Sequence, residues 1–585
     1  MLKSGITKVT AAVAIIAIII AAGAGIIVGQ TSFQTTPTTV TTTVTESSTQ
    51  INTQTATVTT TIQTSTTTPE LEPKKGGDLR IGVIKQDGST LDPLMTAQGT
   101  MLNTIWNLIF EPLVYVDENW KIVPGLATSW EIVDEFTYDF TLRQGVKFHD
   151  GTDFNAEAVK FTFERAREPA FKSMGFLIES VDVLDNYKVR FHIKSDAATP
   201  WVDFLYWMGK VPQGYMTYSP TAFNTMGAEK FGRNPAGTGP FKFVEWFDQD
   251  HITVERFDGY WGEEPYLDRV IVQVIPDSAV RALKLEKGEL DMAEIDPPQV
   301  ARLNRTQDVI VNFGPPAAHI VMGFNVRNGS EYLVQSNPNS HLVRQAISYA
   351  IDRQAIIDTI LYGYGTPAID RMMPGQEPYY DPALQIYPPN ADPEKAKQLL
   401  AEAGYPDGIE FSIDTSGGFV DGVKTATIMI EQLAKANIKL TINDVEFGIL
   451  IAHVFAPNFD SMIYDQGGMP PVSEFLVDYH SQAWPPKAFG NIPFANDTKI
   501  DASIEQLRSI WNTDKTEAKK LSDSIQKRWM EQGYHVSLYY KHLIQGMNTD
   551  VKGYVMMPTV RVEYEGAGGF IICRPATGIN VWLDR

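Results

Sequence analysis

The chain has 585 residues, of which 43% are hydrophobic and 11% aromatic, enough for several domains and a large core. Its formal net charge is −21 and no cluster of lysine or arginine stands out, so no nucleic-acid partner is expected. Cys573 is the sole cysteine, which excludes an intrachain disulfide, a cysteine-based zinc site and a lipid anchor on a cysteine near the N-terminus.

The N-terminal segment is typical of a membrane anchor. Lys3 and Lys8 precede an uncharged run rich in Ala and Ile, Val9 to Gly29. As a helix rising about 1.5 Å per residue, this run is long enough to cross a hydrocarbon core of about 30 Å. Because no charge follows until Glu46, the positive-inside rule places the rest of the chain outside. Residues 1–30 are therefore predicted to hold a monomeric body at the cell surface on the cytoplasmic membrane, with a cleaved signal peptide as the alternative.

The following segment, 31–73, is dominated by Thr with some Ser and Gln. It has too few large apolar side chains to offset chain entropy, so we expect disorder. Such tracts between a membrane segment and a domain are typical of O-glycosylated stalks, and a bare flexible linker is the alternative.

Tyr138 to Arg165 predicts a strand, a tight turn and a helix. Phe140 and Leu142 alternate with polar residues, as on a strand with one buried face. His149-Asp150-Gly151 supplies the turn, and Asn155 is placed to cap the helix. No catalytic constellation lies on this stretch.

Further along, helical and strand patterns alternate. His341 to Leu361 predicts one helix, and Asp392 to Gly404 a second that begins with a capping acid followed by Pro. Strands at Glu410–Asp414 and Lys439–Val445 flank a helix at Val423–Ala436, which is an α/β arrangement.

Several of these segments resemble one family. Tyr138–Arg165 is similar to the signature region of the family 5 extracellular solute-binding proteins, the peptide-binding and oligosaccharide-binding subunits of ABC importers. Other motifs of the family follow in its order: Leu79–Val83, Glu111–Val114, Pro124–Glu131, Gly237–Phe241, Gly259–Gly262, His341–Leu361 and Asp392–Gly404. The resemblance covers residue 76 to about residue 554.

The resemblance implies an α/β, two-lobed, type II-like periplasmic-binding-protein fold with an extra domain. The implied parts are lobe I (76–115, 235–325 and 536–585), the extra domain (116–234) and lobe II (326–535). Two crossings would form a hinge around a solute-binding cleft. Gly237–Phe241 resembles a place where the family's chain passes between lobes.

The sequence carries no nucleophile elbow, phosphate-binding loop or zinc-protease motif. Its 9 histidines show no ligand spacing, and His149 is interpreted as a structural residue. The chain is therefore predicted to bind rather than to catalyse, and neither cofactor nor metal is expected.

The resemblance also bears on the solute. Peptide-binding members carry an Asp that pairs with the peptide's free amine, after a Trp three residues earlier. Here the corresponding positions are Met469 and Gln466, so Asp465 is the available substitute. Gln466 with Gly467 and Gly468 would instead suit a neutral solute such as a sugar. The candidate ligand-binding residues are Asp465, Gln466, Gly467, Gly468, Met469, Trp201, Trp207 and Trp484, the tryptophans having core packing as their alternative role.

We therefore predict the substrate-binding subunit of an ABC importer, with permease and ATPase subunits as partners. Peptides lead on the family's bias, and oligosaccharides follow closely. A nickel complex, a surface-anchored enzyme and a structural envelope protein are the remaining alternatives.

Overall fold

The computed structural model divides the chain into two compact units, Met1–Glu72 and Pro73–Arg585. The described residues are 42–45, 55–58, 72–86, 88–95, 99–117, 121–134, 136–168, 178–194, 204–205, 208, 216–417, 421–466, 471–484, 490–511, 513–556, 570–574 and 579–585. No helix among them is both long and apolar enough to cross a membrane. The predicted anchor, 1–30, lies outside them.

The predicted stalk contains one antiparallel strand pair, β1 (Thr42–Thr45) and β2 (Thr55–Val58). This differs from the expected absence of secondary structure. Thr and Val are β-branched, and such residues favour extended backbone. The rest of the predicted stalk up to residue 71 lies outside the described residues.

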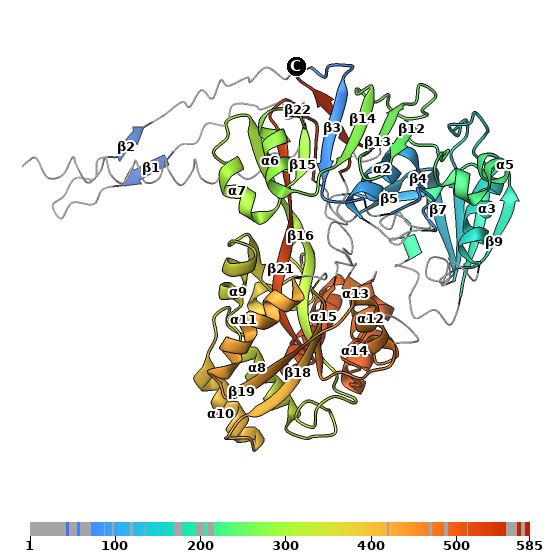
Figure 1. The fold of residues 1–585 in the computed structure, drawn as a ribbon. Coiled ribbons are helices and arrows are strands. Elements are labelled where there is room, and N and C mark those ends of the chain that lie inside the picture. Colours follow the sequence, from blue (N-terminus) through green and yellow to red (C-terminus); the bar gives the residue numbers. More distant parts are fainter. Residues whose placement is uncertain are drawn as a thin grey trace, which may run out of the picture. The chain divides into compact units, whose positions relative to one another are not determined.

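The second unit is organised by one long mixed sheet with the order β12-β13-β14-β3-β15-β21-β16-β20-β18-β19, and with β17 beside β21 (Figure 1). The strands are β3 (Asp78–Val83), β12 (Phe241–Phe247), β13 (His251–Arg256), β14 (Arg269–Val274), β15 (Met292–Glu294), β16 (Val309–Phe324), β17 (Gly365–Pro367), β18 (Ile409–Thr415), β19 (Ile438–Asp444), β20 (Ser461–Gln466) and β21 (His535–Asn548).

Strands β16 and β21 connect the two lobes. They pair antiparallel from Val309 opposite Asn548 to Gly323 opposite His535. At one end β21 also pairs with β15 of lobe I, and at the other end β16 pairs with β20 of lobe II. The register shifts on both sides of Pro316, a residue without a backbone N–H to donate. The fold is thus the expected α/β two-lobed one, with these strands as its crossings.

The prediction that Gly237–Phe241 lies between the lobes is wrong. Ala236 and Phe241 flank this loop and belong to one buried cluster of lobe I. A Cβ on Gly237 would lie 2.0 Å from the carbonyl oxygen of Ile109, at the end of α2 (Thr100–Ile109). The glycine is required because the loop packs directly on helix backbone.

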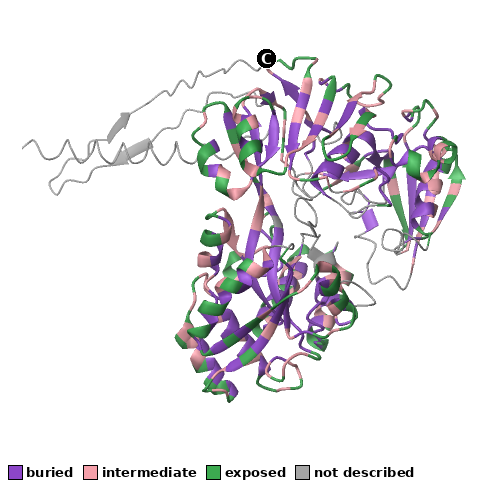
Figure 2. Cartoon of the chain, in the orientation of Figure 1, coloured by how far each residue is buried: buried purple, intermediate pink, exposed green. Residues whose placement is uncertain are grey.

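Each part has its own buried core, visible as purple ribbon in Figure 2. Lobe I packs α2, α6 (Ser278–Glu286) and α7 (Pro297–Leu303) against its strands. The extra domain packs α3 (Ala156–Ala166) on a sheet ordered β7 (Ala127–Asp134), β8 (Thr137–Leu142), β10 (Lys188–Ile193), β9 (Ile178–Asp185). Shorter elements are β4 (Glu111–Pro112), β5 (Val114–Val116), β6 (Ile122–Pro124), β11 (Met216–Thr217), α5 (Pro220–Phe231), β22 (Val551–Lys552), β23 (Cys573–Arg574), β24 (Ile579–Asn580) and β25 (Trp582–Leu583).

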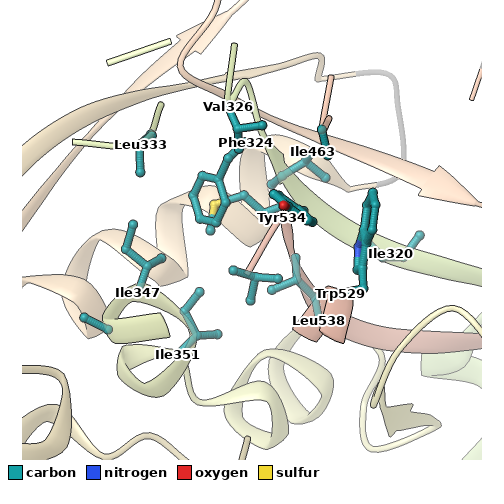
Figure 3. Close-up of a cluster of buried hydrophobic side chains, with 14 of the residues drawn as sticks. Ile320, Phe324, Val326, Leu333, Ile347, Ile351, Ile463, Trp529, Tyr534 and Leu538 are labelled. Carbon is teal, nitrogen blue, oxygen red and sulfur yellow. The ribbon is translucent and has the colours of Figure 1, made fainter. Parts of the chain in front are cut away.

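The core of lobe II joins strands and helices. Figure 3 shows Ile320 and Phe324 of β16 and Ile347 of α8 among its side chains. Its helices are α8 (Ser340–Ala350), α9 (Arg353–Ile360), the 3-10 turn η2 (Pro382–Leu384), α10 (Pro393–Ala403), α11 (Gly422–Ala434), α12 (Phe447–Phe455), α13 (Pro471–Asp478), α14 (Thr498–Ile510) and α15 (Lys515–Gln532). The first residue of this core in the sequence is Ala318 on β16. The exact boundaries predicted for the lobes and the extra domain stay a prediction.

The predicted strand, turn and helix of the signature stretch are confirmed as β8 and α3. Asn155 caps α3 because its side chain accepts from the backbone N–H of Ala158 at 3.1 Å. The alternation predicted that Asp139 lies on the exposed face of the strand. It is instead 4% exposed, and its carboxylate pairs with Arg190 at 2.6 Å. The hydrogen bond from Arg190 lowers the pKa of Asp139, which keeps the carboxylate charged.

The single helix predicted over His341–Leu361 is wrong, because two helices, α8 and α9, occupy it. Asp352 starts the second by accepting from the backbone N–H of Ala355 at 2.8 Å. Arg353, 1% exposed, donates to the carbonyl oxygens of Ser348 and Ile351. These side-chain bonds satisfy the backbone groups that the break leaves open.

Candidate functional site

Buried polar side chains gather where β16 and β21 enter lobe II. His319 on β16 lies opposite Gln466 on β20 and opposite Tyr540 on β21. Directly opposite residues of antiparallel strands point to the same face, so these side chains share one face of the sheet. All are buried, with exposed fractions of 0%, 6% and 0%. We call this group, together with Asp370, Arg371, Asp478 and His535, the crossing cluster.

His535 has a defined tautomer. The indole N–H of Trp529 donates to His535 Nδ1 at 3.0 Å, and an indole nitrogen is only a donor. The ring proton therefore resides on Nε2, which donates to Asp370 Oδ1 at 3.1 Å. Tyr479 OH donates to the same oxygen at 3.0 Å. Asp370 Oδ2 has no hydrogen-bond partner within the part of the chain that the structure describes.

Tyr540 fixes the backbone of the same segment. Its hydroxyl accepts from the N–H of Ile369 at 3.2 Å and donates to the carbonyl oxygen of Asp370 at 2.7 Å. Burial raises the pKa of Tyr540, so the phenol keeps its proton. Asp370 is thus held over β21 by both its backbone and its carboxylate.

An ion pair lies beside this group. Arg371 Nη2 is 2.6 Å from Asp478 Oδ2 at the end of α13, and the two side chains are 1% and 4% exposed. Burial, with the proximity of His535 and Arg371, holds the pKa of His319 well below its usual value. His319 is therefore neutral, and neither ring nitrogen has a hydrogen-bond partner among the described residues.

Of the predicted site residues, Gln466 belongs to the crossing cluster. Asp465 precedes it on β20, and successive residues of a strand point to opposite faces. Trp484 is partly buried, lies 6.5 Å from Phe494 between ring centroids and carries the guanidinium of Arg327 at 4.9 Å. Trp484 therefore packs against this core, and its role in solute binding stays a prediction. Gly467, Gly468, Met469, Trp201 and Trp207 lie outside the described residues.

Sequence reasoning missed His319, Asp370, Arg371, Asp478 and His535. They come from separate segments: His319 and His535 lie on the paired strands β16 and β21, Asp370 and Arg371 follow β17, and Asp478 ends α13. One sequence signal could have indicated them, namely a charged or imidazole side chain within a run of apolar residues. His319 is an example. None of the described residues forms a group of three or more His, Cys, Asp or Glu that could hold a metal ion.

Lobe I contains a different buried acid, Glu111. It accepts from Trp261 Nε1 at 2.7 Å, from Thr238 Oγ1 at 2.9 Å and from Tyr260 OH at 2.9 Å. Burial raises its pKa to about 7, and these hydrogen bonds offset part of that shift. Because both oxygens have donors, Glu111 joins three segments of the chain rather than offering a site.

His149 is a structural residue, as predicted. Its Nε2 is 2.9 Å from the carbonyl oxygen of Gly239, and its Nδ1 accepts from the N–H of Gly237 at 3.3 Å. Burial lowers its pKa to about 4, so the ring is neutral near pH 7.

Comparisons with known proteins cover most of the chain. Residues 121–485 match the model of the bacterial extracellular solute-binding proteins, family 5 middle. The glutathione-binding protein GsiB of Pectobacterium atrosepticum is 28% identical over 494 residues, which span 82% of this chain and 92% of GsiB.

Solved structures similar to this fold hold different solutes. DppA of Helicobacter pylori in complex with the peptide STSA has a TM-score of 0.67 and 25% identity, covering 88% of this chain and 99% of DppA. NikA of Brucella suis in complex with Fe(III)-EDTA has a TM-score of 0.67 and 25% identity, covering 82% of this chain and 97% of NikA. Since a peptide and a metal chelate are both held by this fold, the fold alone does not fix the solute.

Proposed function

Because the chain belongs to the family 5 bacterial extracellular solute-binding proteins, which serve ABC importers and are not enzymes, we propose that it captures short peptides and delivers them to a membrane permease. The observation that carries the proposal is the match to a glutathione-binding protein over 82% of this chain, since glutathione is itself a tripeptide. The peptide-bound relative DppA supports the same class of solute.

Capture needs no bond to be broken. The lobes are joined by β16 and β21, and paired crossing strands permit hinge closure around a solute. The crossing cluster supplies polar groups at the end of lobe II nearest these strands. Permease and ATPase subunits would then complete transport.

A thermal-shift screen tests the solute class. A solute that binds only the native state stabilises it and so raises the melting temperature. At a concentration of 100 times its Kd, the stabilisation free energy is about 2.7 kcal/mol. We expect glutathione and di- to tetrapeptides to raise it, and maltotriose and a nickel chelate to leave it unchanged. Stabilisation by the sugar alone would replace peptides with the oligosaccharide alternative, and stabilisation by the chelate alone would favour metal transport.

We also propose that Val9–Gly29 anchors the chain to the cytoplasmic membrane and that the Thr-rich segment 31–73 is a glycosylated stalk. The support is the uncharged length of the first segment and the composition of the second. Intact mass measurement of the chain isolated from its own membranes is the test. A chain that lacks residues 1–30 and partitions into the soluble fraction would refute the anchor.

A further inference from the structure

The two crossing strands lose their regular pairing part-way between the lobes. The register passes from Phe313 opposite Ile544 to Pro316 opposite His542, so β16 has one residue more than β21 in this interval. Over the same interval, the other edge of β21 exchanges β17 of lobe II for β15 of lobe I. Proline has no N–H to donate, and an irregular ladder bends more readily than a regular one. Bending of the crossings therefore concentrates here, on strands that Figure 1 shows running between the lobes.

A segment of lobe II reaches across this interval. Tyr364 follows α9, whose Ile356 and Ile357 belong to the core of lobe II. Its ring nevertheless packs against the buried cluster that α6, α7 and β15 form in lobe I. It also stacks on Phe313 of β16, with ring centroids 5.4 Å apart and an angle of 27° between the ring planes. Tyr364 thus connects lobe II with lobe I outside the strand ladder.

The backbone holds Tyr364 in this position. Its N–H donates to the carbonyl oxygen of Leu361 at 2.8 Å. Gly363 before it has a φ of 82°, in the left-handed region that glycine adopts without a steric cost. Gly365 after it pairs with Lys541 of β21 as the first residue of β17. The tyrosine therefore lies on a fixed turn between a helix and a strand.

A histidine links three strands at the same place. Nδ1 of His542 on β21 donates to the carbonyl oxygen of Gly314 at 2.9 Å, since a carbonyl oxygen only accepts. Nε2 of the same ring is 3.0 Å from the hydroxyl of Thr366 on β17. Gly314 lies in the irregular interval, between the paired residues Phe313 and Pro316. His542 thus joins β16, β21 and β17 where the ladder is weakest.

We propose that Tyr364 and Phe313, with His542 beside them, form a hinge brace that sets the angle between the lobes. Tyr364 moves with lobe II and Phe313 with lobe I, so a change of this angle must slide or separate the two rings. An aromatic pair contributes a factor of about 2 to 10 to an equilibrium constant, enough to shift the balance between two arrangements of similar free energy. Because only the binding-competent fraction captures a solute, the brace tunes apparent affinity whatever the solute is.

Distances between spin labels on the two lobes test the brace in the full chain without solute. Val280→Cys on α6 and Ile449→Cys on α12 place the labels at side chains that are 44% and 46% exposed. Cys573 is 4% exposed and burial raises the pKa of its thiol, so it stays unlabelled. Pulsed double electron–electron resonance then gives the distribution of distances between the lobes.

Tyr364→Ala should change the ratio of the populations in this distribution by about 2- to 10-fold, because it removes the stack. Tyr364→Phe keeps the ring and should retain the wild-type distribution. Phe313→Ala should act as Tyr364→Ala does, and the double variant should add no further change, since both remove the same contact. Phe313 is 44% exposed, so its replacement serves if Tyr364→Ala does not fold.

The matched control is Tyr332→Ala, which removes an aromatic contact within lobe II alone. The rings of Tyr332 and Tyr405 have centroids 5.1 Å apart, and both pack on the core of that lobe. This variant should keep the wild-type distances. Unchanged distances in both Tyr364→Ala and Phe313→Ala would overturn the brace, and so would an equal change in Tyr332→Ala, because it would indicate general loosening. The thermal-shift screen tests peptide capture separately, so either proposal can fail without the other.

Discussion

Among the buried carboxylates, Glu111 of lobe I and Asp370 of lobe II have different surroundings. Glu111 and Asp370 are both 1% exposed. Glu111 has donors at each oxygen, among them Trp261 at 2.7 Å and Tyr260 at 2.9 Å. Asp370 has donors at one oxygen and none from the described residues at the other.

The difference separates an acid whose acceptors the chain fills from one whose acceptors it fills only in part. A carboxylate whose acceptors are all filled by the chain contributes to stability and offers nothing to a solute. A carboxylate that is half filled retains the capacity to bind a donor from outside the chain. Burial and a shifted pKa alone would have selected Glu111, because its pKa rises to about 7. Counting the donors at each oxygen selects Asp370 instead.

The largest expected effect comes from removing the filled acid. Glu111→Leu leaves the N–H of Trp261 and the hydroxyls of Thr238 and Tyr260 without their acceptor. Breaking such a buried network typically costs about 3–5 kcal/mol of unfolding free energy. Urea denaturation measures it, with peptide binding by the folded fraction unchanged. A loss below about 1 kcal/mol would contradict the structural role of Glu111.

The pH dependence of stability gives the next effect. The pKa of Glu111 is about 7 in the folded chain against 4.5 as its ordinary value, so its stabilisation is complete below pH 4.5 and is lost as the pH rises through 7. The shift corresponds to about 3 kcal/mol. His149 acts with the opposite sign, because its lowered pKa of about 4 makes its stabilisation disappear as the pH falls from 6.5.

These opposing contributions require a variant to separate them. The unfolding free energy of Glu111→Gln should rise with pH from about 4 to 6.5, since only the His149 contribution remains. The wild-type chain should show a flatter profile over the same window. Equal profiles in urea titrations at pH 4, 5, 6 and 7 would mean that Glu111 does not titrate there.

Much of the fold was predictable because local patterns and tertiary structure agree. The cap at Asn155, the acid and proline that open α10 and the strands around α11 all follow from residues close in sequence. The prediction of one helix over His341–Leu361 was wrong because the apolar stripe runs on without interruption. The break arises where Asp352 caps a new helix.

The candidate site was less predictable because its residues are distant in sequence. Gln466 was identified from the family motif, but its neighbours His319 and Tyr540 lie on strands whose pairing no local pattern specifies. The family motif places its acid at the position of Met469, whereas Asp370 lies in the segment after β17. Only strand register places it beside β21.

Trp529→Phe tests how Asp370 is held in place. The change removes the donor to His535 Nδ1, which fixes the proton on Nε2 and thereby the bond to Asp370. Loss of one buried hydrogen bond and some volume predicts a cost of about 1–3 kcal/mol of unfolding free energy. Nitrogen-15 imidazole shifts report the tautomer, and an unchanged Nε2–H form would show that Trp529 does not set it.

The smallest effect on stability is expected from Asp370→Asn, and it is the sharpest test of the comparison. Asparagine keeps an oxygen for Tyr479 and His535 and removes a buried charge whose second oxygen has no described donor. The unfolding free energy without peptide should therefore change by less than about 1 kcal/mol. The isosteric Glu111→Gln should lower it more at pH 7, because that acid has donors at both oxygens. Urea denaturation of both variants measures the contrast. If Asp370→Asn instead lowers the unfolding free energy by several kcal/mol, Asp370 is a structural acid like Glu111. The fold would then depend on its carboxylate, and an amide could not replace it without a large loss of stability.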